Sequence, residues 1–184
     1  MSLHEIGLKH GTDKATFHGF CDFYEQHLPG RDFSGRLLEI GIMGGCSLRM
    51  WSEYYPDAEI VGIDIDDKGY LDLPDNVSVI VGDATDHHVM QPLGDFDIIV
   101  DDGSHLTSDQ QMSFLWLFYN QLQPGGVYIL EDLHTSLPGF PGLYVDSKVL
   151  PVEMLKRQGV NVEFFRRSDE SMTAIIFAEQ GNNA

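Results

Sequence analysis

Two short acidic motifs, each with a histidine just downstream, are the parts of this 184-residue sequence whose residue types could do chemistry. They read DDGSH (101–105) and EDLH (131–134), and each directly follows an apolar run. Carboxylate oxygens can bind a hard cation, and an imidazole can accept a proton. Acids at strand ends also commonly cap the helix that follows. The motifs alone therefore leave a chemical site and a purely structural role both open.

The elements that must position these motifs form an alternating series of strands and helices. Runs such as IIV and YIL lack a polar alternation, as is typical of strands covered on both faces. The alternation predicts an α/β fold with a mostly parallel sheet. Strands are predicted at 36–42, 58–66, 76–86, 95–105 and 126–134, and helices at 46–55, 108–122 and 149–158.

The two ends of the chain are predicted to complete one domain spanning 1–184. Residues 1–30 are interpreted as a helical preface or lid, and 135–161 as a short, mobile, Pro- and Gly-rich insertion that includes a helix. The segments 162–167 and 172–179 flank a polar SDES turn and predict a closing antiparallel hairpin.

The helix at 108–122 has the clearest pattern. Ser108 and Gln111 fit a capping box at its start. Five apolar residues at helical spacing are interpreted as core, namely Met112, Phe114, Leu115, Leu117 and Phe118.

Composition excludes several classes of protein. The chain is 42% hydrophobic, which is typical of a globular protein, and its net charge of −18 disfavours binding to nucleic acid or to anionic membranes. No stretch approaches the length of a membrane span, and the N-terminus does not resemble a signal peptide. The two cysteines, Cys21 and Cys46, form no framework, so a cytoplasmic location is expected.

The carboxyl ends of the first three predicted strands suggest a nucleoside site. The first strand delivers Glu39 and then a turn with Gly41 and Gly45, which lets a ligand approach the backbone, although a tight turn without a ligand fits equally well. Asp64 follows about 20 residues later, where an acid can take ribose hydroxyls. Asp83 ends the third strand and could accept an adenine amino group.

The same residues narrow the choice of adenosine cofactor. The sequence lacks both the G-x-G-x-x-G spacing and a P-loop lysine, so it offers no seat for a pyrophosphate or a triphosphate. An acid before the glycines, Glu39, would repel phosphates. It suits a cationic ligand such as S-adenosyl-L-methionine, which carries a sulfonium and an ammonium group.

At this point the chain resembles the class I S-adenosylmethionine-dependent methyltransferases, with their Rossmann-like sheet. More narrowly it resembles the metal-dependent macrolide-sugar O-methyltransferases of antibiotic biosynthesis, the mycinamicin and demethylmacrocin type. The matching segments are GTDKATFH (11–18), LLEIGIMGGCSLRMW (37–51), VGIDID (61–66), DDGSH (101–105) and LEDLHTS (130–136). The resemblance implies a methyl transfer from S-adenosylmethionine to a hydroxyl, assisted by Mg²⁺.

The resemblance also implies a role for individual residues. It makes Asp102, Glu131 and Asp132 the Mg²⁺ ligands and His105 the catalytic base. Such oxygen ligands favour Mg²⁺ or Ca²⁺ over zinc. The cofactor positions that it implies are Thr12, Lys14, Glu39, Gly41, Gly45, Asp64 and Asp83. Asp101 is a further candidate for the cofactor site, because it either faces the cofactor's amino group or only finishes its strand.

Three other residues are open to more than one interpretation. The spacing places His134 beyond the acidic edge, and we interpret it as structural. His18 and Tyr24 lie in an aromatic segment that forms either core or lid, and they are candidates for contact with the acceptor or the cofactor.

The expected function is a Mg²⁺-dependent O-methyltransferase whose acceptor is a hydroxylated small molecule, a sugar or polyol of a natural product. Two alternatives remain. One is a cofactor-binding module without methyl-transfer activity, and the other is a metal-dependent enzyme of different chemistry on the same fold. The chain has almost none of the extra N-terminal domain of the family and a short acceptor segment, so a homo-oligomer that completes the pocket is also considered.

Overall fold

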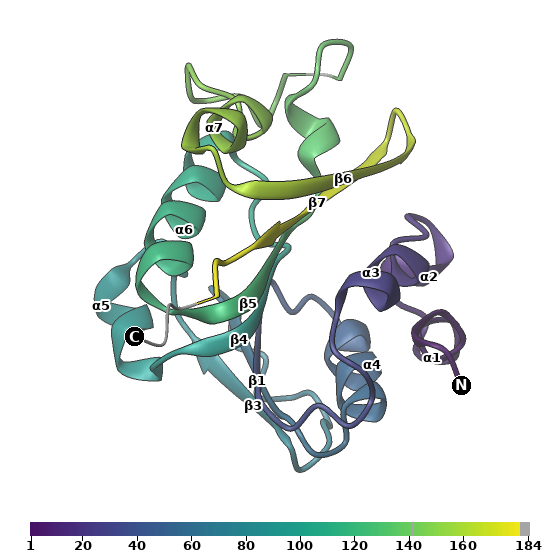
Figure 1. The fold of residues 1–184 in the computed structure, drawn as a ribbon. Coiled ribbons are helices and arrows are strands. Elements are labelled where there is room, and N and C mark those ends of the chain that lie inside the picture. The colour runs from purple at the N-terminus through teal and green to yellow at the C-terminus, as the bar shows by residue number, and fades with distance from the viewer. Residues whose placement is uncertain (141, 181–184) are drawn as a thin grey trace.

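A seven-stranded sheet between two layers of helices forms the centre of the molecule in the computed structural model, which describes residues 1–140 and 142–180 (Figure 1). The strand order is β3-β2-β1-β4-β5-β7-β6. All neighbours are parallel except around β7, which is antiparallel to both β5 and β6. The predicted Rossmann-like α/β sheet with a C-terminal hairpin is therefore confirmed. The strands are β1 Arg36–Ile40, β2 Glu59–Asp64, β3 Val77–Val81, β4 Phe96–Asp101, β5 Leu122–Leu130, β6 Asn161–Ser168 and β7 Ser171–Phe177.

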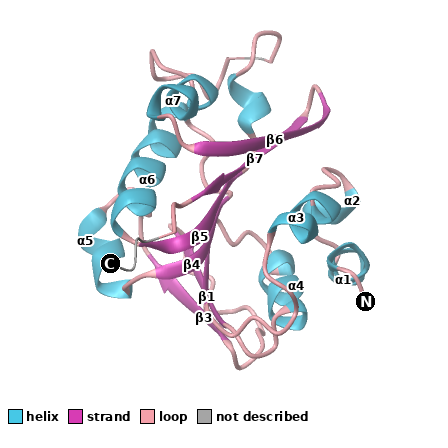
Figure 2. Ribbon diagram, viewed as in Figure 1, coloured by secondary structure: helices cyan, strands magenta, loops and turns pink. Residues whose placement is uncertain are grey.

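One face of the sheet is covered by the N-terminal helices together with α4 (Figure 2). A capping box between Ser2 and Glu5 starts the first of these helices. Buried aromatic rings join the layers, with Trp51 stacked between Tyr24 and Tyr55 at centroid distances of 6.4 and 6.3 Å. The helices of this face are α1 Leu3–His10, α2 Asp13–Thr16, α3 Cys21–His27 and α4 Cys46–Tyr54.

The opposite face is covered by α6 and α7, with a second hydrophobic core beneath them (Figure 1). Phe114 of α6 meets Tyr128 of β5 edge to face, with centroids 5.2 Å apart. The helices predicted at 108–122 and 149–158 are thus present with shifted ends. The elements of this side are α5 His87–Met90, the 3₁₀ helix η1 Gln91–Leu93, α6 Thr107–Asn120, the 3₁₀ helix η2 Leu133–Ser136 and α7 Pro151–Gln158.

The predicted start of α6 is wrong. The helix begins at Thr107, and neither Ser108 nor Gln111 forms the expected capping box. The cap comes instead from Asp146 in the loop before α7. Its carboxylate accepts hydrogen bonds from the backbone N–H and the hydroxyl of Ser108, at 2.9 and 2.6 Å, and from the hydroxyl of Thr107. A distant residue satisfies the first turn, so the local sequence could not indicate the cap.

Two of the five predicted core residues of α6 are wrong as well. Phe114 and Leu117 are fully buried and Phe118 is packed against the core, but Met112 is 53% exposed and Leu115 is 39% exposed. Toward its N-terminus the sheet-facing stripe of α6 continues with polar side chains, which line a cavity. Apolar spacing alone therefore misplaced the buried face.

The switch point of the sheet lies between β1 and β4, because β1 is followed by β2 on one side and has β4 on the other. Ligands of open parallel sheets bind outside the carboxyl ends of the strands at such a point. None of the described helices is both long enough and apolar enough to cross a membrane.

Candidate active site at the carboxyl edge of the sheet

Three neighbouring strands, β1, β4 and β5, end side by side and present the acidic motifs at one edge. The backbone N–H of Asp102 donates to the carbonyl of Ile40 at 3.0 Å, and that of Glu131 donates to the carbonyl of Asp101 at 3.0 Å. The parallel ladder thus continues one residue beyond the strands. It brings the two acidic motifs together, as the sequence predicted.

Gly41 lets the first loop pass close to the fourth strand. Its φ is +87°, and a Cβ added there would lie 2.1 Å from the carbonyl oxygen of Asp102. Only glycine fits a position that needs both a positive φ and this approach. The glycine at this position therefore allows the loop after β1 to contact the loop after β4, whether or not a ligand is bound.

Asp102, His105 and Asp132 form one compact cluster. A ligand atom from each lies within 4.8 Å of the others, and His105 Nε2 is 3.2 Å from Asp132 Oδ2. In the described part of the chain nothing forms a hydrogen bond with the buried atoms Asp132 Oδ1 and His105 Nδ1. Two carboxylates and an imidazole with unused lone pairs are a donor set that a divalent cation such as Mg²⁺ or Mn²⁺ accepts.

Backbone strain is concentrated at the same place. Among the described residues, three that are not glycine have a positive φ: Met43 at 47°, His105 at 61° and Asp132 at 53°. All three line one cavity of about 480 Å³. Strained residues of this kind cost about 1–3 kcal/mol each and cluster at functional sites.

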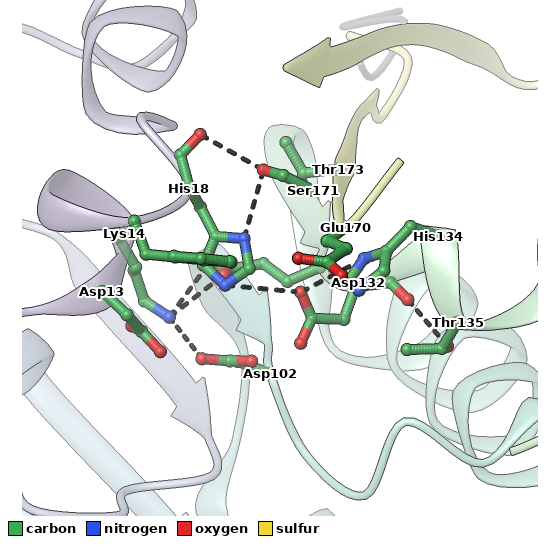
Figure 3. A network of polar contacts seen from close by, with 12 residues as sticks. Asp13, Lys14, His18, Asp102, Asp132, His134, Thr135, Glu170, Ser171 and Thr173 are labelled. Atoms are coloured by element: carbon green, nitrogen blue, oxygen red, sulfur yellow. Dashed lines mark hydrogen bonds and ion pairs between the residues drawn. The ribbon is translucent and has the colours of Figure 1, made fainter. Parts of the chain in front are cut away.

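A buried lysine, Lys14, lies beside Asp102 of the cluster (Figure 3). Lys14 of α2 pairs with Asp102, with Glu131 at 3.1 Å and with Glu39 at 3.5 Å. Burial raises the pKa of Glu39 to about 7 and the pKa of Glu131 well above its usual value, although Lys14 opposes both shifts. Burial would lower the pKa of Lys14, but Asp102, Glu131 and Glu39 outweigh it and the pKa is raised.

The structure brings most of the predicted site residues to two adjoining cavities. The larger cavity, of about 480 Å³, is lined by Thr12, Gly41, Asp64, Asp102, His105 and Asp132. The smaller, of about 260 Å³, is lined by Gly41, Asp64, Asp83 and Asp101. Gly41 and Asp64 line both cavities, so the two cavities lie side by side at the switch point and are here together called the cleft.

Four predicted site residues do not line these cavities. Lys14, Glu39 and Glu131 are buried beneath the cleft, where both glutamates pair with Lys14. Gly45 takes a left-handed conformation as the N-cap of α4. The expected contacts of Glu39, Lys14 and Gly45 with the cofactor therefore stay predictions. In the structure these residues form ion pairs or begin a helix.

The acids at the ends of β2 and β3 also order their own loops. Asp64 accepts hydrogen bonds from the backbone N–H groups of Ile42 and Asp66, both at 2.9 Å. Burial would raise the pKa of Asp64, but these N–H groups and Lys68 outweigh it, and the pKa is lowered. Asp83 accepts from the N–H of Thr85 at 2.8 Å. Both carboxylates stay in the cleft with their orientation fixed.

Asp101 was ambiguous in the sequence, and its contacts are internal. Its carboxylate accepts hydrogen bonds from the hydroxyls of Ser113 at 2.5 Å and Tyr128 at 2.7 Å. Burial raises its pKa. Asp101 thus fastens α6 and β5 to the end of β4 and forms the floor of the smaller cavity.

His134 lies close to Asp132 but lines neither of the two cavities, and its interpretation as a structural residue stays a prediction. The 3₁₀ helix η2 turns the chain back, so His134 is buried with Nδ1 3.7 Å from Asp132 Oδ1. His18 Nε2 lies 3.9 Å from the same oxygen (Figure 3). Tyr24, in contrast, is a core residue whose hydroxyl lies 3.2 Å from the hydroxyl of Thr173. A histidine just after an acidic pair was the available signal for His134.

Comparisons with known proteins agree with this geometry. The rhamnosyl tetracenomycin-C 2'-O-methyltransferase of Streptomyces olivaceus is 39% identical over 165 residues, which covers 83% of this chain and 43% of that protein. Mycinamicin VI 2''-O-methyltransferase of Micromonospora griseorubida is 38% identical over 76% of this chain and 38% of its own length. The chain is therefore related in sequence to sugar O-methyltransferases of antibiotic biosynthesis and has the class I methyltransferase fold.

A solved structure supports the same relationship for the methyltransferase fold. The MycE methyltransferase of the mycinamycin pathway, in complex with Mg and SAH, superposes with a TM-score of 0.81 and 29% identity. The match covers 100% of this chain and 56% of that one. No protein-family model matches the chain. The chain spans about two fifths of the length of these two curated relatives.

Proposed function

We propose that this chain is an S-adenosylmethionine-dependent O-methyltransferase that methylates a sugar hydroxyl of a glycosylated small molecule, with the help of a divalent cation. The observation that carries the proposal is the shared cleft. The Asp102, His105 and Asp132 cluster opens into the same cavity as the glycine turn and the acid of β2. The relatives named above support it, because they are sugar O-methyltransferases of natural products.

The cleft fits a nucleoside donor. Asp64 lies between the two cavities, where its carboxylate can accept ribose hydroxyls, and Asp83 faces the smaller cavity, which suits adenine. S-adenosylmethionine supplies a methyl group on a sulfonium centre. The acidic lining of the larger cavity favours that positive charge.

Asp102 and Asp132 are the residues that would hold the cation. Their oxygens are hard donors, and Asp132 Oδ1 is buried with no hydrogen-bond partner among the described residues. A bound Mg²⁺ supplies Lewis acidity, which fixes an acceptor hydroxyl and lowers its pKa. Glu131 is a further candidate ligand, but in the structure Lys14 is paired with its carboxylate.

His105 is the base that we propose for the acceptor's proton. Its ring lines the large cavity, and Asp132 Oδ2 at 3.2 Å from Nε2 fixes its orientation. A positioned base of this kind contributes about 10²–10⁴-fold to the rate. Tyr144 lies at the edge of the same ring, with centroids 6.0 Å apart, and helps to enclose it.

The test is methyl transfer from radiolabelled S-adenosylmethionine to mycinamicin VI and demethylmacrocin, with Mg²⁺ or with EDTA. We expect turnover that EDTA abolishes. Asp102→Asn should lose at least tenfold in Mg²⁺ affinity and lose turnover, yet still bind S-adenosylhomocysteine in calorimetry.

Asp66→Asn is the matched control, because Asp66 lines the same cavity but is exposed and lies outside the cluster. It should bind Mg²⁺ like the wild type. Absence of S-adenosylhomocysteine binding by the wild type, or full turnover by Asp102→Asn in EDTA, would refute the proposal.

A further inference from the structure

Lys14 is the least expected feature of the site, because a full positive charge lies where a cation is proposed to bind. The side chain is 1% exposed and reaches from α2 to the ends of β4 and β5. Its ammonium pairs with Asp102 Oδ2 and lies 3.1 Å from each oxygen of Glu131. Glu39 Oε1 is 3.5 Å away on the third side.

The ammonium is held as a charged group. Three carboxylates, those of Asp102, Glu131 and Glu39, lie within ion-pair distance of its nitrogen. A lysine ammonium has no lone pair and cannot ligate a metal. In this arrangement it acts on Asp102 and Glu131 only as a counter-ion.

The carboxylates of Asp102 and Glu131 are partners of Lys14 and also candidate ligands of the cation. Asp102 belongs both to the Lys14 ion pair and to the cation cluster with His105 and Asp132. Both oxygens of Glu131 lie 3.1 Å from the Lys14 nitrogen. Glu131 directly precedes Asp132 of the cation cluster in the chain. A dication bound to Asp102 would lie a few ångströms from the ammonium in a buried setting, where like charges repel strongly.

We propose that Lys14 is an internal counter-ion that competes with the divalent cation for Asp102 and Glu131. Metal binding then withdraws the ammonium and frees the Glu131 carboxylate as an additional ligand. This inference rests on the metal site of the proposed function. Because Thr12 and Asp13 beside Lys14 line the cofactor cavity, loading with metal also changes how α2 is held over that cavity.

Mg²⁺ titration by calorimetry of the full chain, freed of metal with EDTA and then dialysed, tests the competition without any methyl transfer. Lys14→Met keeps the length and the apolar stem but removes the charge. We expect it to bind Mg²⁺ at least tenfold more tightly than the wild type. Lys14→Arg keeps the charge and should bind no more tightly than the wild type.

Lys9→Met is the control for net charge. Lys9 pairs with Glu53 on the surface of α1, away from the cluster, and its loss should change Mg²⁺ affinity by no more than about twofold because surface charges are screened. A Lys14→Met variant that binds Mg²⁺ no more tightly than the wild type overturns the competition. If neither the wild type nor Lys14→Met binds Mg²⁺, both the competition and the metal site of the proposed function are refuted.

A second measurement on the wild type covers the case in which Lys14→Met does not fold. Brief acetylation with an N-hydroxysuccinimide ester, read by peptide mass spectrometry, reports the accessibility of each lysine. In EDTA, Lys14 should be protected, and saturating Mg²⁺ should speed its modification several-fold while Lys9 stays unchanged. Equal protection of Lys14 in EDTA and in saturating Mg²⁺ contradicts the withdrawal of its ammonium.

Discussion

His105 and Asp132, whose side chains meet, both take a backbone conformation that L-amino acids disfavour. Their φ values of 61° and 53° turn the two loops toward each other, and the 3.2 Å contact between Nε2 and Oδ2 links them. Each such residue costs about 1–3 kcal/mol. The cluster thus has a stability cost that the rest of the fold offsets, which is expected of a site selected for its geometry.

His105→Asn separates the chemical role of this residue from its backbone role. Asparagine tolerates the left-handed conformation but does not accept protons near neutral pH. We expect turnover to fall by about 10²–10⁴-fold, with the free energy of unfolding within about 1 kcal/mol of the wild type. Steady-state kinetics and urea unfolding measure the two effects. Wild-type turnover in this variant would exclude His105 as the proton acceptor.

At the scale of single residues, the sequence predicted which acidic residues come together, but it did not predict their basic partners. The DDGSH and EDLH motifs follow neighbouring parallel strands, so their convergence could be inferred from topology. Lys14 and Glu131 are far apart in the sequence, and only the tertiary fold brings them together. No sequence pattern therefore indicates this pair. The return of His134 to Asp132 depends on a 3₁₀ turn after the strand, which the sequence did not reveal.

At the scale of elements, the β1–α4 turn leaves no room for a side chain at Gly41. Gly41→Ala places a methyl group 2.1 Å from the Asp102 carbonyl oxygen at a φ of +87°. We expect a loss of at least about 2 kcal/mol in the free energy of unfolding and a large loss of S-adenosylhomocysteine affinity.

Gly44→Ala provides the control in the same turn, because an added Cβ there has nothing within 4 Å. It should unfold within about 0.5 kcal/mol of the wild type. Equal stability of the two variants would show that the turn is not as close to β4 as the structure has it.

The buried face of α6 can be tested with two adjacent residues. Phe114 is fully buried against β5, whereas Leu115 is 39% exposed. Phe114→Ala should lower the free energy of unfolding by about 3–5 kcal/mol, and Leu115→Ala by less than about 1 kcal/mol. Urea unfolding of both proteins gives the comparison. A larger loss for Leu115 would mean that the helix is rotated from the orientation described.

The strands were predictable as elements because buried apolar runs mark them, and each predicted strand is present. Their ends were less predictable. The fifth strand begins at Leu122 and not at 126, since its Pro-Gly-Gly segment lies within the strand at an irregular pairing with β4. The cap of α6 comes from Asp146 in the loop before α7, so only the tertiary structure reveals it.

At the scale of the whole molecule, the N-terminal helices are packed onto the sheet. Cys21 at the start of α3 is fully buried, and burial, with a further contribution from Glu131, raises its pKa to about 12. Since the thiolate is the reactive form, Cys21 is unreactive at pH 8 in the folded protein. Below its pKa this thiol therefore stays neutral, and only more alkaline solution or unfolding exposes its reactivity.

Alkylation with iodoacetamide at pH 8 checks this packing. Cys46 is only partly buried and should be modified in the native protein, while Cys21 should react only after denaturation in urea. Peptide mass spectrometry distinguishes the two sites. Rapid native modification of Cys21 would indicate that residues 1–30 open away from the sheet.

The overall architecture could be predicted from the strand–helix alternation, and the relationship to the sugar O-methyltransferases from a few motifs. The part of the site expected to bind the methyl acceptor, between η2 and α7, could not be predicted in the same way. The chain covers 56% of MycE, and the segment between η2 and α7 has no apolar periodicity from which its contacts could be inferred. Asp146 and Phe140 give that loop its contacts with α6 and His134, respectively.

The most direct test of the central claim is a crystal structure of the chain with S-adenosylhomocysteine and Mg²⁺ bound. The account predicts one Mg²⁺ at about 2.1 Å from carboxylate oxygens of both Asp102 and Asp132, with the nucleoside in the cleft beside Gly41 and Asp64. An ion bound elsewhere, or a nucleoside on the other side of the sheet from the cluster, would contradict it.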